Sequence, residues 1–269
     1  MGGGSGDEQG ASQTGAEAKH PSRRREERVF LAFGYEGKAV WAGWMLPLWD
    51  TQPHRRTPVL TVLLILGCVG VFVYEVLLLS EPKGDATLAR FVTEFALVPR
   101  RLLAGWADPT EWRTMVSAMF LHGGVAHVLG NCWFLWIFGN NVEDRLGFFG
   151  FGLFYAFTGA VAALAQVVAE PGSALPMIGA SGAISGVLGA YLVFYPRAWV
   201  VALVPWVVPV LPVPAVIFLV LWFFAQTWAG VGSLMSGTAA AGGVAWWAHA
   251  GGFMAGALVA MALPRRRRR

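Results

Sequence analysis

The stretch GASGAISG, residues 179–186, decides the fold, because three glycines, two alanines and two serines stand there between strongly apolar segments. Glycine costs a helix roughly 1 kcal/mol relative to alanine, so this run would make a poor helix in water. Inside a membrane, small residues allow two helix backbones to approach closely. The run therefore predicts a helix packed against a neighbour within a bilayer.

The composition agrees with a membrane protein. Hydrophobic residues make up 56% of the 269 residues and charged residues only 13%. The basic residues gather before Thr57 and in the final run 265–269, and such flanks on an apolar core indicate contact with anionic lipid rather than nucleic acid. Cys68 and Cys132 both fall in apolar segments, which indicates inert thiols rather than a disulfide or a metal site.

Six apolar runs are candidates for membrane-spanning helices, which need about 20 residues each. They are residues 59–79, 115–138, 148–168, 181–195, 213–228 and 246–263, of which the fourth is short. Residues 199–211 are also apolar, but Pro205, Pro209 and Pro212 argue against a further regular span there. We therefore predict an all-α integral membrane protein with six transmembrane helices.

The charge distribution predicts the topology. Six spans place both chain ends on one side, and the arginine clusters put that side in the cytoplasm. The segment 81–113 then becomes a large external loop. We expect a basic, largely disordered cytoplasmic segment at 1–56, a six-span domain at 57–264 and a cytoplasmic poly-arginine tail at 265–269. Both Met1 and Met45 remain open as the natural start.

Polar residues inside the second run are expensive in lipid and need partners. His127 and Asn131 are four residues apart and share a helix face, and His122 lies just before them. Hydrogen bonding between helices is the more frequent role of such a pair, and metal binding is the alternative. The spacing HxxxxHxxxN has no acidic neighbour and matches no familiar zinc site, so we predict neither a metal nor another cofactor.

The fourth and sixth runs both present small faces. Gly252 and Gly256 form a GxxxG step on the face that also carries His249, and Gly182 borders the face of Ser181 in the fourth run. Close packing of these two helices is expected whatever their function. The packing brings Ser181, at the start of one helix, near His249, in the first turn of the other.

A serine beside a histidine has chemical consequences. The hydroxyl is a weak nucleophile that an adjacent general base activates. No acidic residue follows in the last three runs to orient His249, so a Ser–His dyad is the simplest arrangement. Ser181 is preferred over Ser185 because its amide lies at a helix start, where an oxyanion is stabilised. His127 and Asn131 supply further donors, and Ser185 is expected to bond back to a carbonyl.

Three segments together resemble the rhomboid family of intramembrane serine proteases, in its bacterial form: WRTMVSAMFLHGGVAHVLGNCWFLWIFGNNVEDRLG (112–147), GASGAISG (179–186) and AHAGGFMAG (248–256). The resemblance spans residues 46–263. It implies a six-helix bundle whose short fourth helix starts at mid-bilayer, below a cavity open to the outside.

The resemblance also implies roles for single residues. Ser181 corresponds to the nucleophile and His249 to its base, and the Ser181 amide, His127 and Asn131 correspond to the oxyanion donors. Glu143 corresponds to a residue that braces the external loop from below. The remaining positions are structural or supporting: His122, Trp112, Arg113, Gly179, Gly182, Gly252 and Gly256.

The function predicted on this basis is cleavage of transmembrane-anchored proteins in or near the membrane. We expect a multi-pass protein of the cell (inner) membrane, with the lipid bilayer and transmembrane substrates as partners, no nucleic acid, and an active site open to the external side. Two alternatives are a catalytically inactive rhomboid-like protein that binds membrane proteins for quality control, and a small transporter. The oligomeric state and the substrate are not predicted.

Overall fold

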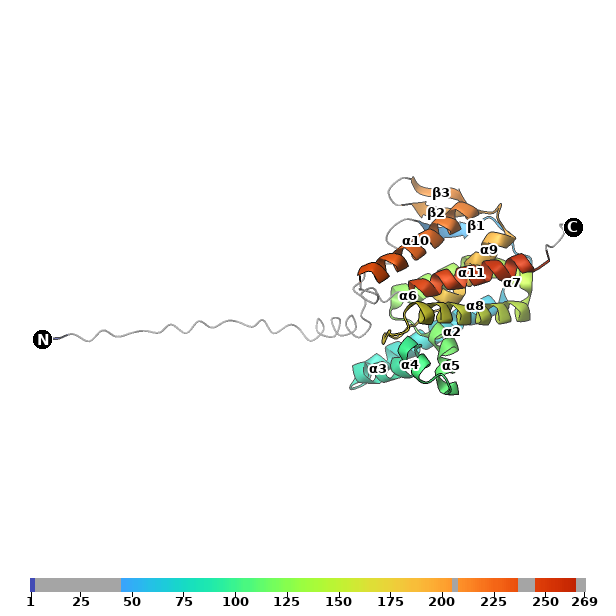
Figure 1. Ribbon diagram of the computed structural model, residues 1–269. Coiled ribbons are helices and arrows are strands. Elements are labelled where there is room, and N and C mark those ends of the chain that lie inside the picture. Colours follow the sequence, from blue (N-terminus) through green and yellow to red (C-terminus); the bar gives the residue numbers. More distant parts are fainter. Residues whose placement is uncertain (3–44, 205–207, 237–244, 265–269) are drawn as a thin grey trace.

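A computed structural model of the chain describes residues 1–2, 45–204, 208–236 and 245–264. In these ranges a bundle of helices carries a small sheet on one side and a group of short helices on another (Figure 1). The helices are α2 (Val59–Ser80), α3 (Gly84–Phe95), α4 (Pro99–Ala104), α5 (Pro109–Ser117), η1 (Ala118–Phe120), α6 (Val125–Phe134), η2 (Leu135–Gly139), α7 (Asn140–Leu146), α8 (Phe148–Ala169), α9 (Ser181–Phe194), α10 (Ala215–Ser236) and α11 (Trp246–Ala262). The strands are β1 (Leu46–Asp50), β2 (Trp199–Val204) and β3 (Val208–Pro214).

Two helices, α2 and α8, are long and apolar enough by themselves to cross a membrane, each with 22 residues. Shorter apolar helices are α9 and the part of α10 from Ala215 to Trp228. In five of the predicted runs, the first residue lies within two residues of the first residue of a helix. These helices are α2, α8, α9, α10 and α11. The positions of these helices thus follow the apolar runs closely.

The second predicted run begins too early. Residues 115–120 belong to α5 and η1, and the chain then leaves helical geometry before α6 starts at Val125. Gly123 and Gly124 interrupt the helix, since glycine disfavours helix continuation. From Val125 the helix runs on through the π-helical segment η2 to Leu146. Apolar composition could not reveal this start, because the residues on both sides of the break are equally apolar.

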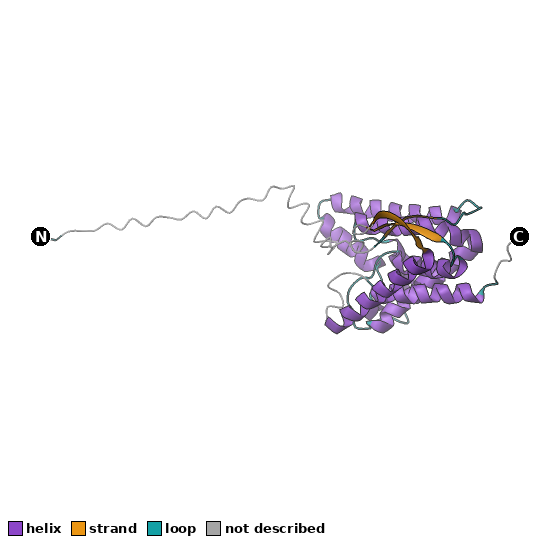
Figure 2. Ribbon diagram, turned by 90° about the horizontal axis from the view of Figure 1, so that it is seen from above, coloured by secondary structure: helices purple, strands orange, loops and turns teal. Residues whose placement is uncertain are grey.

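The described parts of the proline-containing segment are the strands β2 and β3, so the prediction of an all-α protein missed an element; Pro205 lies outside the described residues. β2 pairs antiparallel with both β1 and β3, in the order β1-β2-β3. Figure 2 shows the strands in orange among the purple helices. Pro209, Pro212 and Pro214 all lie in β3, the edge strand, where a missing N–H group costs least. β1 lies within the segment 1–56 that was predicted to be largely disordered; residues 3–44 and 265–269 of the predicted tails lie outside the described residues.

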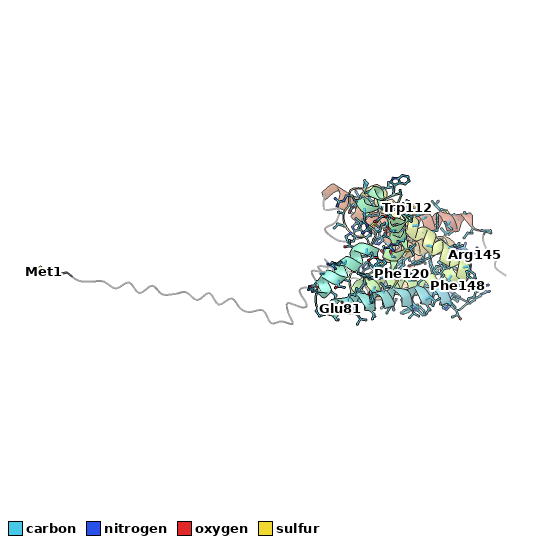
Figure 3. All side chains as sticks on the ribbon, turned by 90° about the horizontal axis from the view of Figure 1, so that it is seen from below. Met1, Glu81, Trp112, Phe120, Arg145 and Phe148 are labelled. Carbon is cyan, nitrogen blue, oxygen red and sulfur yellow. The ribbon has the colours of Figure 1, made fainter. Side chains whose placement is uncertain are left out.

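Polar contacts identify the two ends of the bundle. At one end the Thr51 amide donates to the Trp199 carbonyl (2.9 Å), Asn141 Nδ2 donates to Asp50 Oδ2 (2.8 Å) and the Arg145 side chain donates to the Pro264 carbonyl (2.5 Å). At the other end Leu97 and Met177 exchange backbone hydrogen bonds. Figure 3 shows Arg145 and Phe148 near the first end and Glu81 near the second. The first and last elements, β1 and the C-terminal end of α11, therefore share an end.

Glycines bring α9 and α11 into backbone contact. A Cβ atom on Gly252 would collide with the Gly182 carbonyl oxygen, and one on Gly256 would collide with the Gly186 carbonyl oxygen. On the other side of α9, a Cβ on Gly186 would collide with the Thr158 side chain of α8. The close approach expected from the small faces is present, and it places the start of α9 beside the first turn of α11.

Candidate active site

Ser181 and His249 are in hydrogen-bond contact across the interface of α9 and α11. Ser181 is the first residue of α9, and its Oγ lies 2.7 Å from Nε2 of His249. His249 lies in the first turn of α11 and is only 7% exposed. The juxtaposition expected from the helix faces is therefore observed, with the serine at a helix start whose free amides favour negative charge.

The other ring nitrogen of His249 has a partner that the sequence reasoning did not foresee. Its Nδ1 lies 2.7 Å from Oε1 of Gln226, a buried side chain of α10. Trp222, one turn earlier on α10, packs against the imidazole with ring centroids 6.0 Å apart. Gln226 is neutral, so the absence of acidic residues from the last three runs did not point to it. The signal in the sequence that could have identified Gln226 is that it is a polar residue inside the apolar run 213–228.

His127 and Asn131 converge on Gly179, two residues before Ser181. A Cβ atom on Gly179 would lie 2.7 Å from His127 Nε2 and 3.4 Å from Asn131 Nδ2. Gly179 has φ +115°, a backbone conformation that favours glycine. The glycine therefore keeps open the space toward which both side chains point.

The donor character of these two side chains follows from their other contacts. The Gly123 amide donates to Nδ1 of His127 (3.4 Å), so in the neutral ring Nε2 carries the hydrogen. Asn131 is 3% exposed, and its Nδ2 has no hydrogen-bond partner among the described residues. A buried donor without a partner is costly, and an acceptor placed beside Gly179 would satisfy it.

Ser185 has a different environment from Ser181. It is 1% exposed, and its hydroxyl donates to the Ser181 carbonyl oxygen at 2.6 Å. This bond back to the preceding turn is the one expected from its position in the helix. Although both serines face the same side of α9, the hydroxyl in contact with the imidazole belongs to Ser181.

His122 packs against His127 and so supports the site. Its Nδ1 contacts the Phe120 carbonyl oxygen (3.0 Å), and its ring packs edge-on against His127 with centroids 5.1 Å apart. Its backbone amide donates to the buried carboxyl group of Glu75 in α2 (3.2 Å). Glu75 is the one charged residue of the apolar run 59–79, and it anchors the turn that leads into α6.

Trp112 and Arg113 lie in α5, within the segment that was predicted to form an external loop. Trp112 Nε1 donates to the Trp106 carbonyl oxygen at 2.7 Å. Arg113 pairs with Glu94 at 3.4 Å and lies over the ring of Phe95. These contacts join α5 to α3 and to the turn that follows α4, and they do not reach Ser181.

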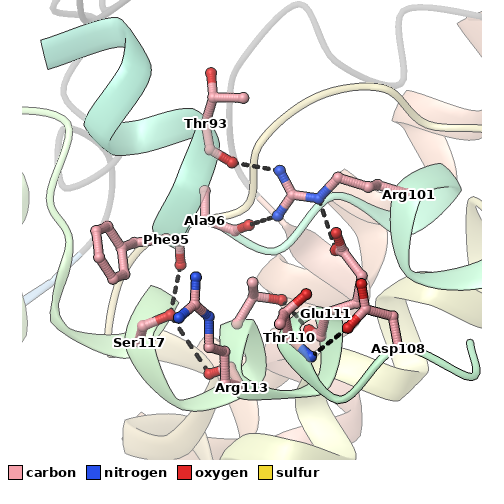
Figure 4. Close-up of polar contacts among 10 residues, drawn as sticks. Thr93, Phe95, Ala96, Arg101, Asp108, Thr110, Glu111, Arg113 and Ser117 are labelled. Atoms are coloured by element: carbon pink, nitrogen blue, oxygen red, sulfur yellow. Dashed lines mark hydrogen bonds and ion pairs between the residues drawn. The ribbon is translucent and has the colours of Figure 1, made fainter. Parts of the chain in front are cut away.

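The same region contains a polar network built around Arg101 (Figure 4). Its guanidinium group pairs with Glu111 at 2.6 Å and donates to the carbonyl oxygens of Thr93 and Ala96. A hollow of about 500 Å³ opens beside this network but is not lined by Ser181 or His249. A smaller hollow of about 40 Å³ does reach Ser181 and Gly179, so size alone does not locate the site.

Glu143 contacts the start of α2. Its carboxyl oxygens accept hydrogen bonds from the amides of Leu60 and Thr61 and from the Thr61 hydroxyl, each at 2.8 Å. These contacts lie in the first turn of α2, at the end of the bundle that carries the sheet, and none joins residues 81–113. Glu143 therefore caps the start of α2, where a carboxylate satisfies free amides, and the bracing role that the resemblance implies stays a prediction.

Comparison with known proteins agrees with the geometry. The Rhomboid domain model matches residues 109–266. Relatives include "Rhomboid-like protein 11, chloroplastic" of Arabidopsis thaliana, 41% identical over 88 residues that cover 33% of this chain and 31% of the relative. Rhomboid protease GluP of Bacillus subtilis (strain 168) is 35% identical over 114 residues, covering 42% of this chain and 21% of the relative.

A third relative is the "Putative rhomboid protease YdcA" of Bacillus subtilis (strain 168), 37% identical over 82 residues that cover 30% of this chain and 41% of the relative. The matches thus span between a fifth and two fifths of these relatives' lengths. The family match itself covers more than half of this chain, including α6, α9 and α11, which carry the site. The chain belongs to the rhomboid family of multi-pass membrane proteins.

Proposed function

We propose that this protein is an intramembrane serine endopeptidase that cleaves transmembrane-anchored proteins in or near the membrane. Membership of the rhomboid family supports protease activity in a membrane. The observation that carries the proposal is the 2.7 Å contact between Ser181 Oγ and His249 Nε2 at the start of α9. An imidazole nitrogen at that distance can remove the hydroxyl proton as the oxygen attacks.

The reaction follows from these positions. Ser181 Oγ attacks the scissile carbonyl carbon while His249 Nε2 accepts the hydroxyl proton. The oxygen of the tetrahedral intermediate faces the Ser181 amide, His127 Nε2 and Asn131 Nδ2, which donate hydrogen bonds to its negative charge. His249 then gives its proton to the leaving amine. A water molecule, deprotonated by the same imidazole, then attacks the acyl carbon. The bond to Ser181 Oγ breaks, the imidazolium returns its proton to that oxygen, and the second product leaves as a carboxylic acid.

The length of α9 suits a site below the membrane surface. Its 14 residues extend about 21 Å at 1.5 Å per residue, less than the roughly 30 Å of hydrocarbon in a bilayer. A helix whose far end lies near the sheet then begins partway across, with Ser181 at its start. Six spans with cytoplasmic ends would open the site to the external side, in the cell (inner) membrane.

The two alternatives predict different chemistry. An inactive rhomboid-like binding protein has no need of an activated serine, yet Ser181 and His249 are in contact. A transporter more often uses carboxylates at its substrate path. Of the described carboxylates inside the helices, Glu75 and Glu143 both accept backbone hydrogen bonds and serve structural contacts. Proteolysis is therefore the function that the site supports best.

The decisive test uses the purified full-length protein in detergent or liposomes with a fluorophosphonate probe and a model transmembrane substrate. Ser181→Ala and His249→Ala should each abolish cleavage, and Ser181→Ala should also abolish labelling. Both variants should keep the thermal unfolding midpoint of the wild type within a few degrees. Cleavage or labelling that persists in folded Ser181→Ala would contradict the proposal.

A further inference from the structure

Gln226 occupies the position in which a triad protease carries an acidic residue. Its Oε1 lies 2.7 Å from Nδ1 of His249, while Nε2 of the same ring lies 2.7 Å from Ser181 Oγ. All three side chains come from different helices, α10, α11 and α9. We infer that Gln226 is a positioning residue that holds His249 in the tautomer able to act as a base. The inference rests on the proposed protease function.

The tautomer follows from what each atom can donate. An amide oxygen only accepts, so its contact with Nδ1 requires a hydrogen on Nδ1. In the neutral ring, Nε2 then carries a lone pair that faces the Ser181 hydroxyl. The reverse amide orientation would place NH₂ at Nδ1 and the hydrogen on Nε2, which would donate to Ser181 and leave no base. Only the first arrangement lets the serine lose its proton.

A neutral acceptor also suits the surroundings. Gln226 is 9% exposed and His249 is 7% exposed, so a carboxylate here would be a buried charge beside a neutral ring before reaction. When His249 gains a proton from Ser181, the Nδ1–H bond to the amide oxygen remains and strengthens, because hydrogen bonds to charged groups are stronger. Gln226 thus supports both protonation states without adding a charge to the apolar interior.

Aromatic rings restrict the imidazole plane as well. Trp222 lies four residues before Gln226 on α10 and tilts against the ring at 35°, and Trp246 meets it edge-on with centroids 6.2 Å apart. Trp222 and Gln226 therefore share one face of α10, and that face contacts both the plane and the Nδ1 edge of His249. The position of α10 sets the orientation of the base.

The test compares three full-length variants: Gln226→Leu, Gln226→Glu and the matched control Thr227→Val. Thr227 is the next residue on α10, and its hydroxyl bonds back to the Phe223 carbonyl oxygen (3.0 Å). Fluorophosphonate labelling to completion counts active molecules, so that kcat is expressed per competent site. We expect Gln226→Leu to lower kcat by about 10- to 100-fold with little change in KM. Gln226→Glu, which keeps an acceptor oxygen, should recover most of that loss, and Thr227→Val should match wild type.

A second measurement distinguishes a role of Gln226 in orienting His249 from a role in packing alone. In ¹⁵N-histidine spectra of the wild type, the His249 resonances, assigned with His249→Ala, should report hydrogen on Nδ1 and none on Nε2. Gln226→Leu should shift this ring to a mixture of tautomers. An unchanged tautomer with unchanged kcat in Gln226→Leu would overturn the inference. Equal loss in the Leu and Glu variants with the tautomer retained would assign Gln226 to packing. Inactive Ser181→Ala alongside fully active Gln226→Leu would refute this inference alone, whereas active Ser181→Ala would refute the proposed function.

Discussion

The hydroxyl of Ser185 donates to the carbonyl oxygen of Ser181 at 2.6 Å, so the two serines of the motif are bonded to each other within one turn of α9. The bond leaves the Ser181 hydroxyl directed at His249. Ser185→Ala should therefore keep fluorophosphonate labelling and lose activity no more than a few-fold. Its unfolding free energy should fall by about 1 kcal/mol, the typical net value of one hydrogen bond. Loss of labelling in a folded Ser185→Ala protein would contradict this assignment.

Asn131 should act on turnover more than on substrate affinity. Loss of one oxyanion donor typically lowers kcat by about 10²- to 10³-fold, and we expect Asn131→Ala to fall in this range with KM nearly unchanged. Asn131→Asp, which keeps the size of the side chain but removes the NH₂ donor, serves as a second variant. Steady-state kinetics on a model transmembrane substrate make the comparison. Wild-type kcat in both folded variants would remove Asn131 from the oxyanion site.

The backbone contact of α9 and α11 predicts that the stability of the protein depends steeply on the size of the residues at this contact. Because a Cβ on Gly256 would collide with the Gly186 carbonyl oxygen, Gly256→Ala should force the helices apart and cost about 1–3 kcal/mol, as other overpacked cores do. Gly70 in α2 is the matched control, since a Cβ there meets nothing within 4 Å. Thermal unfolding in detergent should show a lower midpoint for Gly256→Ala and an equal or higher one for Gly70→Ala.

Asp50 should make stability depend on pH. It accepts hydrogen bonds from Tyr191 and Asn141 at the sheet end of the bundle. Burial, opposed chiefly by the bond from Tyr191, raises its pKa from 3.8 to about 6. The folded state therefore holds a proton that the unfolded state has lost between about pH 4 and 6. The contribution of this group to stability is full below pH 4 and is lost as the pH rises through 6.

The variant Asp50→Asn removes this titration while keeping an oxygen that can accept from Tyr191 and Asn141. We expect the difference in unfolding midpoint between variant and wild type to grow in favour of the variant from pH 4.5 to pH 7.5. The measurement is thermal unfolding in detergent at both pH values. A difference that stays constant across this range would show that Asp50 does not titrate there.

The proposed topology can be tested with single cysteines at opposite ends of the bundle. Ala174, between α8 and α9, and His54, between β1 and α2, are both exposed. A membrane-impermeant maleimide applied to intact cells should label Ala174→Cys and should label His54→Cys only after permeabilisation. The unsubstituted protein, whose Cys68 and Cys132 lie in α2 and α6, provides the background. The opposite labelling pattern would place the site on the cytoplasmic side.

Several features of this protein were determined by local sequence alone. The long apolar runs predict α2 and α8, and the observed last residue of each helix differs by one from the expected one. The prediction works because the length and the apolarity of a spanning helix are properties of a single segment. The small residues of 179–186 and the Gly252–Gly256 step predict close helix contact for the same reason. The pairing of Ser181 with His249 followed from their helix faces and from the motifs shared with rhomboids.

Other features depend on contacts between distant segments. β2 joins a three-stranded sheet because β1, about 150 residues earlier, supplies its second partner beside β3, and no local pattern reveals such a distant partner. The contacts of Glu143 with the first turn of α2 and of Gln226 with His249 also join different helices, so no local pattern reveals them. A search for acidic residues could not find Gln226, since in a buried site a neutral oxygen can orient a histidine without the cost of a second charge. Tertiary packing alone decided which polar side chain faces Nδ1 of the base.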